Sequence, residues 1–291
     1  MKIYNFSIIT PIVISGIDKN DVELRTPSIK GILRWWFRFY KSSFFEVEGL
    51  RKFESEVFGS TENSSPFYMR IVEIPKNIED AYLCMNDKRK KREDGAPRDY
   101  FKIKRQSYSP LQTFKLNFKF LPHFQHQNEI ENSLMLLSFF GGIGGRWRRG
   151  FGSVQIEDFE FKENTFQNLV EEIKQKIKNL KGSNKPTNFM SISDTKIYLI
   201  KPKNKFWNSW SGAMDNLRDN FYRELKKYIR KEKIAYKPSF GQREVSPLII
   251  QIKKVGDNYF GVVLAWEKLD EFEKFNSFLE TLQNHEIVKV G

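Results

Sequence analysis

Cysteine is nearly absent from the sequence: Cys84 is the single one in 291 residues, beside three histidines. One thiol excludes an intrachain disulfide framework and any zinc or iron–sulfur site that needs several cysteines. Long hydrophobic runs are also lacking. The first apolar segment, residues 3–14, is broken by Thr10 and Pro11, which predicts a strand and neither a signal peptide nor a membrane span. We therefore expect a cytoplasmic globular protein without a membrane partner.

Acidic residues are in deficit. The chain carries 49 Lys and Arg against 36 Asp and Glu, a formal net charge of +13. Such an excess favours polyanionic partners, although a Lys-rich composition also arises without any function. Hydrophobic residues make up 40% of the chain and include 27 Phe, which is enough for a packed core. The placement of the charge, more than its sum, decides whether nucleic acid is the partner.

The first half of the chain reads as two successive strand–helix–strand units. The expected strands are residues 3–14, 66–74, 112–121 and 152–161, and the expected helices are residues 26–45 and 129–140. This order is that of a ferredoxin-like domain. A basic insertion, residues 84–110, interrupts it. Nine Lys or Arg and four Asp or Glu lie within 86–105, so we expect a flexible loop or a hairpin there.

The second half repeats part of this order. The expected helices are residues 164–180, 211–232 and 268–284, and the expected strands are residues 194–200 and the two arms of a hairpin, 247–255 and 258–266. A last strand is not apparent. The fold class is therefore α+β, with two tandem ferredoxin-like (RRM-like) domains, residues 1–161 and 162–291, of which the second is degenerate.

The first segment with a functional signal is the helix within residues 24–41. Lys30, Arg34, Arg38 and Lys41 are spaced so that they share one side of a helix, and no acid lies between Arg25 and Lys41. An ordinary amphipathic helix with a solvated basic stripe would give the same pattern. Like charges at this spacing destabilise a helix, however, and a helix N-terminus itself attracts anions. The segment is thus a candidate binding site for RNA phosphates.

The second segment is residues 141–154. Its six glycines, at which backbone N–H groups could approach a phosphate closely, are Gly141, Gly142, Gly144, Gly145, Gly150 and Gly152. Arg146, Arg148 and Arg149 add positive charge, and Trp147 offers a ring for a base. A helix C-terminus followed by a mobile loop is the alternative. The Gly-Lys-Ser/Thr of a P-loop is missing, and the likeness of RGFGSVQI to the RRM octamer ends at Ser153.

Together, ELRTPSIKGILRWWFRFY and GGIGGRWRRGFGSV closely resemble the RAMP superfamily and, more narrowly, the first RAMP subunit of Cmr (type III-B) CRISPR effector complexes. The resemblance implies two ferredoxin-like domains that bind RNA without cutting it. It implies a place at the end of the complex, near the 3′ end of the guide RNA and the 5′ end of the paired target RNA, with other RAMP subunits as neighbours. It further implies no cofactor, metal or small-molecule substrate.

Three other groups of residues are weighed against this interpretation. His123 and His126 could act as general bases in a metal-independent RAMP endoribonuclease that processes CRISPR transcripts, but a turn that supplies polar surface residues explains them better. Asp18, Asp21 and Glu23 lack the ordered spacing of a cation site. His285 is expected to be solvated in the last helical region. A purely architectural subunit with a basic surface is the remaining alternative.

Overall fold

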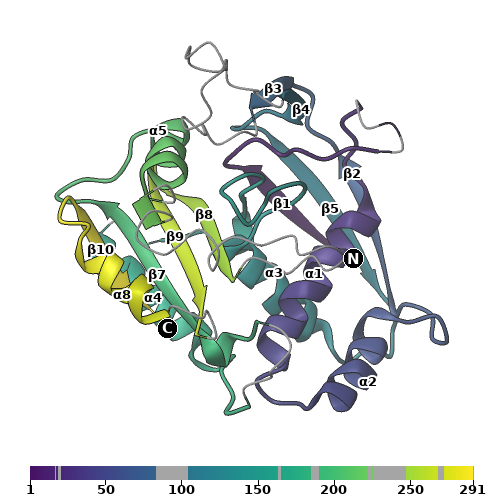
Figure 1. Ribbon diagram of the computed structural model, residues 1–291. Helices are drawn as coiled ribbons and strands as arrows, with labels where there is room; N and C mark the ends of the chain where they lie inside the picture. The colour runs from purple at the N-terminus through teal and green to yellow at the C-terminus, as the bar shows by residue number, and fades with distance from the viewer. Residues whose placement is uncertain are drawn as a thin grey trace, which may run out of the picture.

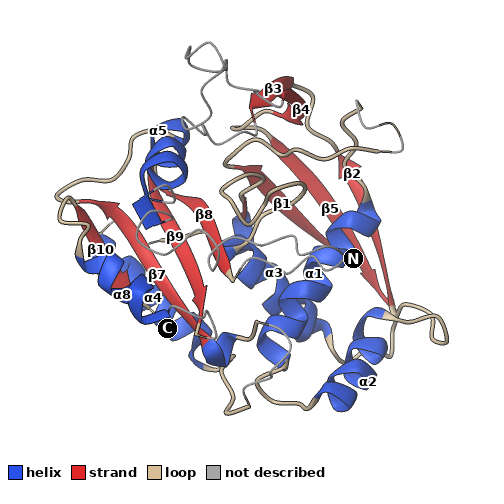
Figure 2. Cartoon of the chain, viewed as in Figure 1, coloured by secondary structure: helices blue, strands red, loops and turns tan. Residues whose placement is uncertain are grey.

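The computed structural model describes residues 1–16, 18, 21–82, 104–162, 165–184, 190–221, 224–225, 247–267 and 272–290. Two four-stranded antiparallel sheets stand side by side, and helices fill the space between and around them (Figures 1 and 2). A separate two-stranded hairpin, β3 (Ile78–Tyr82) with β4 (Lys104–Tyr108), lies at one end of the first sheet.

The first sheet has the order β2-β5-β1-β6. Its strands are β1 (Lys2–Ile8), β2 (Phe67–Glu73), β5 (Thr113–Phe120) and β6 (Val154–Ile156), and the helices that join them are α1 (Thr26–Lys41) and α3 (Gln127–Phe140). Read from the β6 edge, the strands are the fourth, first, third and second of the unit in chain order, which is the arrangement of a ferredoxin-like unit. The predicted topology of the first half is therefore confirmed, although β6 is shorter than expected and continues as a short 3-10 helix, Glu157–Phe159.

Sequence pattern explains the elements of this unit. Alternate residues of β5, namely Phe114, Leu116 and Phe118, are fully buried, as period-two patterning requires. Helix α1 begins at Thr26 with Pro27 in its first turn, where a missing N–H costs nothing. It ends at Lys41, a few residues earlier than expected, because a separate helix follows.

That following helix, α2 (Val47–Phe58), was not predicted. It is rich in charged residues and buries Leu50, Val57 and Phe58. Its apolar residues recur at helical spacing, a pattern that the sequence prediction did not use. Of the basic insertion the structure describes β4, which pairs with β3, a strand that precedes the insertion. Residues 83–103, with Cys84 among them, lie outside the described residues.

The second sheet has the order β10-β7-β9-β8. Its strands are β7 (Thr195–Pro202), β8 (Leu248–Val255), β9 (Asn258–Trp266) and β10 (His285–Lys289), and its helices are α5 (Trp210–Met214), which continues as a π-helix over Asp215–Phe221, and α8 (Phe272–Glu280). The strand order is again fourth, first, third, second. The expectation of a degenerate unit is thus corrected, because β10 completes it; the described part of the expected helix over 211–232 ends at Leu225.

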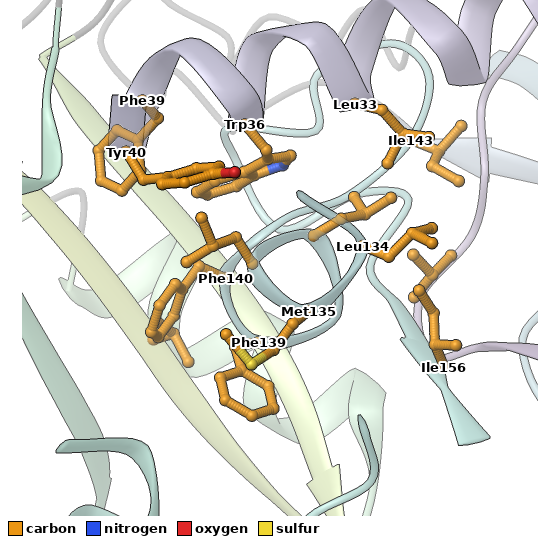
Figure 3. Close-up of a cluster of buried hydrophobic side chains, with 14 of the residues drawn as sticks. Leu33, Trp36, Phe39, Tyr40, Leu134, Met135, Phe139, Phe140, Ile143 and Ile156 are labelled. Carbon is orange, nitrogen blue, oxygen red and sulfur yellow. The ribbon is translucent and has the colours of Figure 1, made fainter. Parts of the chain in front are cut away.

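The two units share one hydrophobic core. Helix α4 (Phe166–Lys178), preceding the second unit, packs on the face of the second sheet that carries Ile197 and Val262, and α3 lies on that side too. Figure 3 shows Trp36 of α1 pointing toward α3, while Phe139 of α3 points away from α1. The opposite face of the second sheet packs against α5 and α8. The position of the domain boundary, between residues 161 and 162, remains a prediction. Of the helices in the described part of the chain, none is long and apolar enough to cross a membrane.

Candidate nucleic-acid interface

The side chains of Lys30, Arg34 and Arg38 on α1 face α2 and the segment that follows it. The Lys30 Nζ donates to the Ser65 Oγ at 2.8 Å, and burial, together with the charge of Arg34, lowers the pKa of Lys30. Arg34 donates through Nη2 to the carbonyl of Gly59. Its guanidinium also lies 5.6 Å from the centre of the Phe58 ring. A serine hydroxyl thus holds Lys30, and a carbonyl, a ring and the Glu54 carboxylate, 3.7 Å from the Arg34 Nε, hold Arg34.

Arg38 forms a bidentate pair with Glu54 of α2, through Nε at 2.5 Å and Nη2 at 2.7 Å. This hydrogen bond raises the pKa of Arg38. The side chain of Arg38 remains 47% exposed, whereas Glu54 is only 12% exposed. The acid that compensates the stripe therefore comes from an element that the sequence pattern did not reveal, and Arg38 still presents positive charge to solvent.

Lys41 is enclosed. Its Nζ lies 2.9 Å from the Glu129 Oε1, and the side chains of the pair are 17% and 16% exposed. Tyr40 donates its hydroxyl to the same carboxylate, and burial and the Glu129 charge raise the pKa of Tyr40. This arrangement fastens the end of α1 to the start of α3, so the geometry gives Lys41 a structural task.

Two adjoining hollows follow this side of α1. One, of about 480 Å³, is lined by Arg34, Arg38 and Arg51 among others. The next, of about 340 Å³, adds Lys30 and the hydroxyl-rich segment 60–65. Guanidinium groups that converge beside hydroxyls match the geometry and charge of phosphate oxygens. The three residues Lys30, Arg34 and Arg38 therefore share one basic groove.

The glycine-rich loop, residues 141–152, is an ordered part of the fold. The amide of Gly145 donates to the carbonyl of Val13 at 2.6 Å, and the amide of Gly152 donates to that of Pro11 at 2.8 Å. The Ile143 amide donates across the loop to the Gly152 carbonyl at 2.7 Å. The expectation of free amides is therefore corrected at Gly141, Gly145 and Gly152. The Gly141 amide donates to the Leu137 carbonyl at 2.9 Å, and the loop uses the other two amides to dock on the segment after β1.

Close packing accounts for most of the glycines. A Cβ would come within 3 Å of another atom at Gly141, Gly142, Gly144 and Gly152. At Gly145 the nearest atom would be 3.3 Å away, and at Gly150 it would be 3.8 Å away. The loop glycines thus let the backbone pass other parts of the protein closely, and the positive charge of the loop is carried by its arginines.

Strand β8 of the second unit supports the loop along its length. Its amide at Ile250 donates to the carbonyl of Arg148 at 3.0 Å, and Arg149 pairs with Ile250 in a parallel bridge. Further along, Ser153 donates its hydroxyl to the carbonyl of Ile252. Since β8 is an edge strand, the loop of the first unit covers an edge that would otherwise be open.

Lys253 of β8 ties both ends of the loop together. Its fully buried Nζ donates to the carbonyls of Gly141 at 2.7 Å and Val154 at 2.8 Å, with a longer contact of 3.4 Å to Leu137. Burial lowers the pKa of this lysine well below its usual value. The sequence interpretation missed Lys253. The sequence feature that could have identified it is the pair of polar residues Gln251 and Lys253, which stand at alternate positions of an otherwise apolar strand.

An aromatic cluster joins the loop to α1. The Trp147 ring centre lies 5.2 Å from that of Trp35, and the Arg148 guanidinium lies 4.9 Å from the Trp35 ring and 5.1 Å from the Trp147 ring. Burial lowers the pKa of Arg148 to about 10. Arg146 of the same loop is exposed. The structure thus brings the two predicted segments together at Trp35, next to the α1 residues that line the basic groove.

The histidines and the acidic residues considered in the sequence analysis lie in different environments. His123 and His126 line a pocket of about 500 Å³ together with Glu56, and the His126 ring lies edge-on 5.0 Å from that of Phe53. Across the described ranges, no cluster of His, Cys, Asp or Glu could hold a metal ion. Asp18, Asp21 and Glu23 therefore form no such cluster. His285 is half-buried on β10, not solvated, and burial lowers its pKa.

The RRM-like octamer is not displayed as a binding strand. Ser153 is fully buried, and Val154 and Ile156 lie in the core. The face of the first sheet away from its helices carries Asn5, Lys115 and Asn117 on its inner strands. In the described part of that face, therefore, the octamer offers no ring on which a base could stack.

A family model describing the RAMP superfamily matches residues 5–155 of the chain. Two curated relatives come from Pyrococcus furiosus. The CRISPR system Cmr subunit Cmr1-1 is 26% identical over 286 residues, which cover 84% of this chain and 80% of the relative. The Cmr subunit Cmr1-2 is 26% identical over 184 residues, 53% of this chain and 94% of the relative.

Two solved structures share the fold. The apo crystal structure of Cmr1 from Pyrococcus furiosus has a TM-score of 0.66 at 22% identity, over 100% of this chain and 99% of that chain. A chain of the type III-B Cmr-beta complex bound to cognate target RNA, solved by cryo-EM, has a TM-score of 0.59 at 13% identity, over 96% and 98%. At these identities the likeness concerns the arrangement of both sheets and their helices.

Proposed function

Because the chain belongs to the RAMP superfamily, we propose that it is a non-catalytic RNA-binding subunit of a type III-B CRISPR (Cmr) ribonucleoprotein. In this proposal it holds the 3′ region of the guide RNA, the 5′ end of the paired target RNA, or both, at the end of the complex during antiviral RNA silencing. Its neighbours are other RAMP subunits. The similarity to two Cmr1 subunits over most of the chain supports this assignment.

The observation that carries the proposal is the basic groove of α1 with the loop cluster beside it. Arg34 and Arg38 stand between α2 on one side and Trp35, with its Arg148 partner, on the other. Arginine forks bind phosphates in a bidentate manner, and the partly buried Trp35 ring lies beside them. The groove thus supplies positive charge for binding RNA phosphates.

The first prediction concerns salt dependence. We expect the combined variant Lys30→Ala, Arg34→Ala, Arg38→Ala to weaken binding of single-stranded RNA and to flatten the plot of log affinity against log salt by about 2, since each lost phosphate contact removes roughly 0.7. Sequence preference should not change, because phosphates carry no base information. Filter binding over a salt series measures both quantities.

A matched control removes the same charge elsewhere. Lys174→Ala, Lys176→Ala, Lys178→Ala takes three lysines from the outer face of α4, away from the basic groove. Its long-range effect on net charge equals that of the groove variant, so its salt slope should stay close to that of the wild type. Equal slopes for the two variants would show that RNA does not lie in the basic groove.

A metal-independent endoribonuclease is the second candidate, and one observation favours it: His123 and His126 share a pocket with Glu56. This pocket also shares Asn63 and Ser64 with the hollow beside Lys30. A histidine near a bound ribose could take the proton from a 2′-hydroxyl. The His126 ring packs edge-on against the rings of Phe53 and Phe124.

Incubation of the purified full chain with CRISPR repeat RNA in EDTA separates the two candidates. We expect no cleavage, because RNA binding alone leaves the phosphodiester intact. Cleavage by the wild type that disappears in the double variant His123→Ala, His126→Ala would replace our proposal with the endoribonuclease. Cleavage that persists in the double variant would indicate a contaminating nuclease, which repurification through a further column identifies.

A further inference from the structure

Gly31 stands at a place in α1 where glycine has no role within the protein. It is the sixth of sixteen residues in the helix and is exposed. A Cβ at this position would meet nothing within 4 Å. Glycine in a helix interior is less stable than alanine because it loses more backbone entropy on folding. Unlike Gly152, whose Cβ would strike a carbonyl, Gly31 is not explained by packing.

Gly31 lies among residues of the candidate nucleic-acid interface. Three and four residues further along, on the same side of the helix, stand Arg34 and Trp35. One turn beyond is Arg38, whose side chain is 47% exposed. Arg148 covers the Trp35 ring from the loop side. The bare backbone of α1 therefore lies between guanidinium groups from two elements.

We propose that the sugar–phosphate backbone of the bound RNA crosses α1 at Gly31, in van der Waals contact with the helix backbone. Phosphates on one side of the crossing meet Arg34 and Arg38, and the nucleotide on the other side meets Trp35. The inference rests on the proposed RNA binding. It adds the position at which the RNA strand crosses the helix and the closeness of that contact. A side chain at position 31 would hold the strand away from both arginines.

Two substitutions of graded size test the contact. Gly31→Ala adds one methyl group, and Gly31→Gln adds a long neutral side chain that also favours a helix. We expect Gly31→Ala to raise the melting temperature by about 1 to 3 °C. We expect its affinity for a fluorescein-labelled, unstructured single-stranded RNA to fall by about fivefold, and that of Gly31→Gln to fall further. Improved stability with weakened binding is a combination that damage to the fold cannot produce.

Gly49 of α2 provides the matched control. It is an exposed helical glycine whose Cβ would make only an ordinary contact, 3.5 Å from the Phe45 ring. Gly49→Ala and Gly49→Gln should leave RNA affinity unchanged, because α2 contributes only the far wall of the groove.

The outcomes separate this inference from the function on which it rests. If both Gly31 variants bind as tightly as the wild type while the Lys30, Arg34 and Arg38 variant loses binding, the crossing at Gly31 is wrong and the proposed function stands. If the wild type fails to bind in low salt, or the groove variant binds normally, the proposed function is wrong and the inference falls with it.

Discussion

Replacement of Lys253 by alanine is expected to lower the free energy of unfolding by about 3 to 5 kcal/mol. The variant loses a long aliphatic stem from a fully buried site, which leaves a cavity. It also leaves the carbonyls of Gly141 and Val154 without the donor that they now share. Relief from burying an ammonium group offsets part of this loss, but a cavity and two unsatisfied carbonyls outweigh it.

Lys253→Met separates the two contributions to this loss. Methionine fills much of the same volume without donating a hydrogen bond, so we expect a smaller loss of about 1 to 3 kcal/mol. Urea denaturation of the full chain, followed by tryptophan fluorescence, measures both variants. A Lys253→Ala variant as stable as the wild type would mean that Lys253 does not fasten the loop to β8.

The stability that Lys253 contributes should depend on pH. Burial lowers its pKa in the folded chain well below the value of about 10.4 that an unfolded lysine has. Between the folded and unfolded pKa values the unfolded chain binds more protons, so the contribution rises as pH increases through that interval. The difference in unfolding free energy between the wild type and Lys253→Met should therefore grow from neutral pH toward about pH 9.5. A difference that shrinks with rising pH would contradict this.

Short-range pattern was enough to predict most of the scaffold. The alternation of Phe114, Leu116 and Phe118 identified β5, and Thr26 with Pro27 marked the start of α1. Helix α2 and strand β10 were overlooked for different reasons. In α2 the apolar residues Val47, Leu50, Phe53 and Val57 do recur at helical spacing, and this pattern went unused. Strand β10 has only five residues, none of them fully buried, so its alternation is weak and its place depends on pairing with β7.

The candidate site was predicted less completely, because its charge balance is long-range. The stripe on α1 has no acid within the helix, yet Glu54 and Glu129 reach Arg38 and Lys41 from α2 and α3. Such pairs depend on tertiary structure and leave no spacing in the sequence. The meeting of Trp35 with Arg148 is of the same kind. The sequence could indicate only that the two segments, residues 24–41 and 141–154, carry basic and glycine residues suited to binding an anion.

Within the glycine-rich loop, we expect substitution of Gly152 to be the most damaging to stability. Its φ is +63°, and a Cβ there would lie 1.8 Å from the carbonyl oxygen of Ile143. We expect Gly152→Ala to lower the free energy of unfolding by about 3 to 5 kcal/mol, the sum of left-handed strain and a forced backbone shift. The shift would also break the Ile143–Gly152 hydrogen bond that closes the loop.

Gly150 separates backbone strain from collision, because its φ is similar but the nearest atom to a Cβ there would be 3.8 Å away. Gly150→Ala should therefore cost only about 1 to 2 kcal/mol. Chemical denaturation gives the stability of both variants, and filter binding gives their RNA affinity. If the loop acts through its shape, Gly152→Ala should also weaken RNA binding in conditions where the chain stays folded, since Trp147 and Arg148 would leave Trp35. Equal losses of stability in the two variants would mean that the loop yields to the added methyl group, and that its glycines matter for conformation and not for close packing.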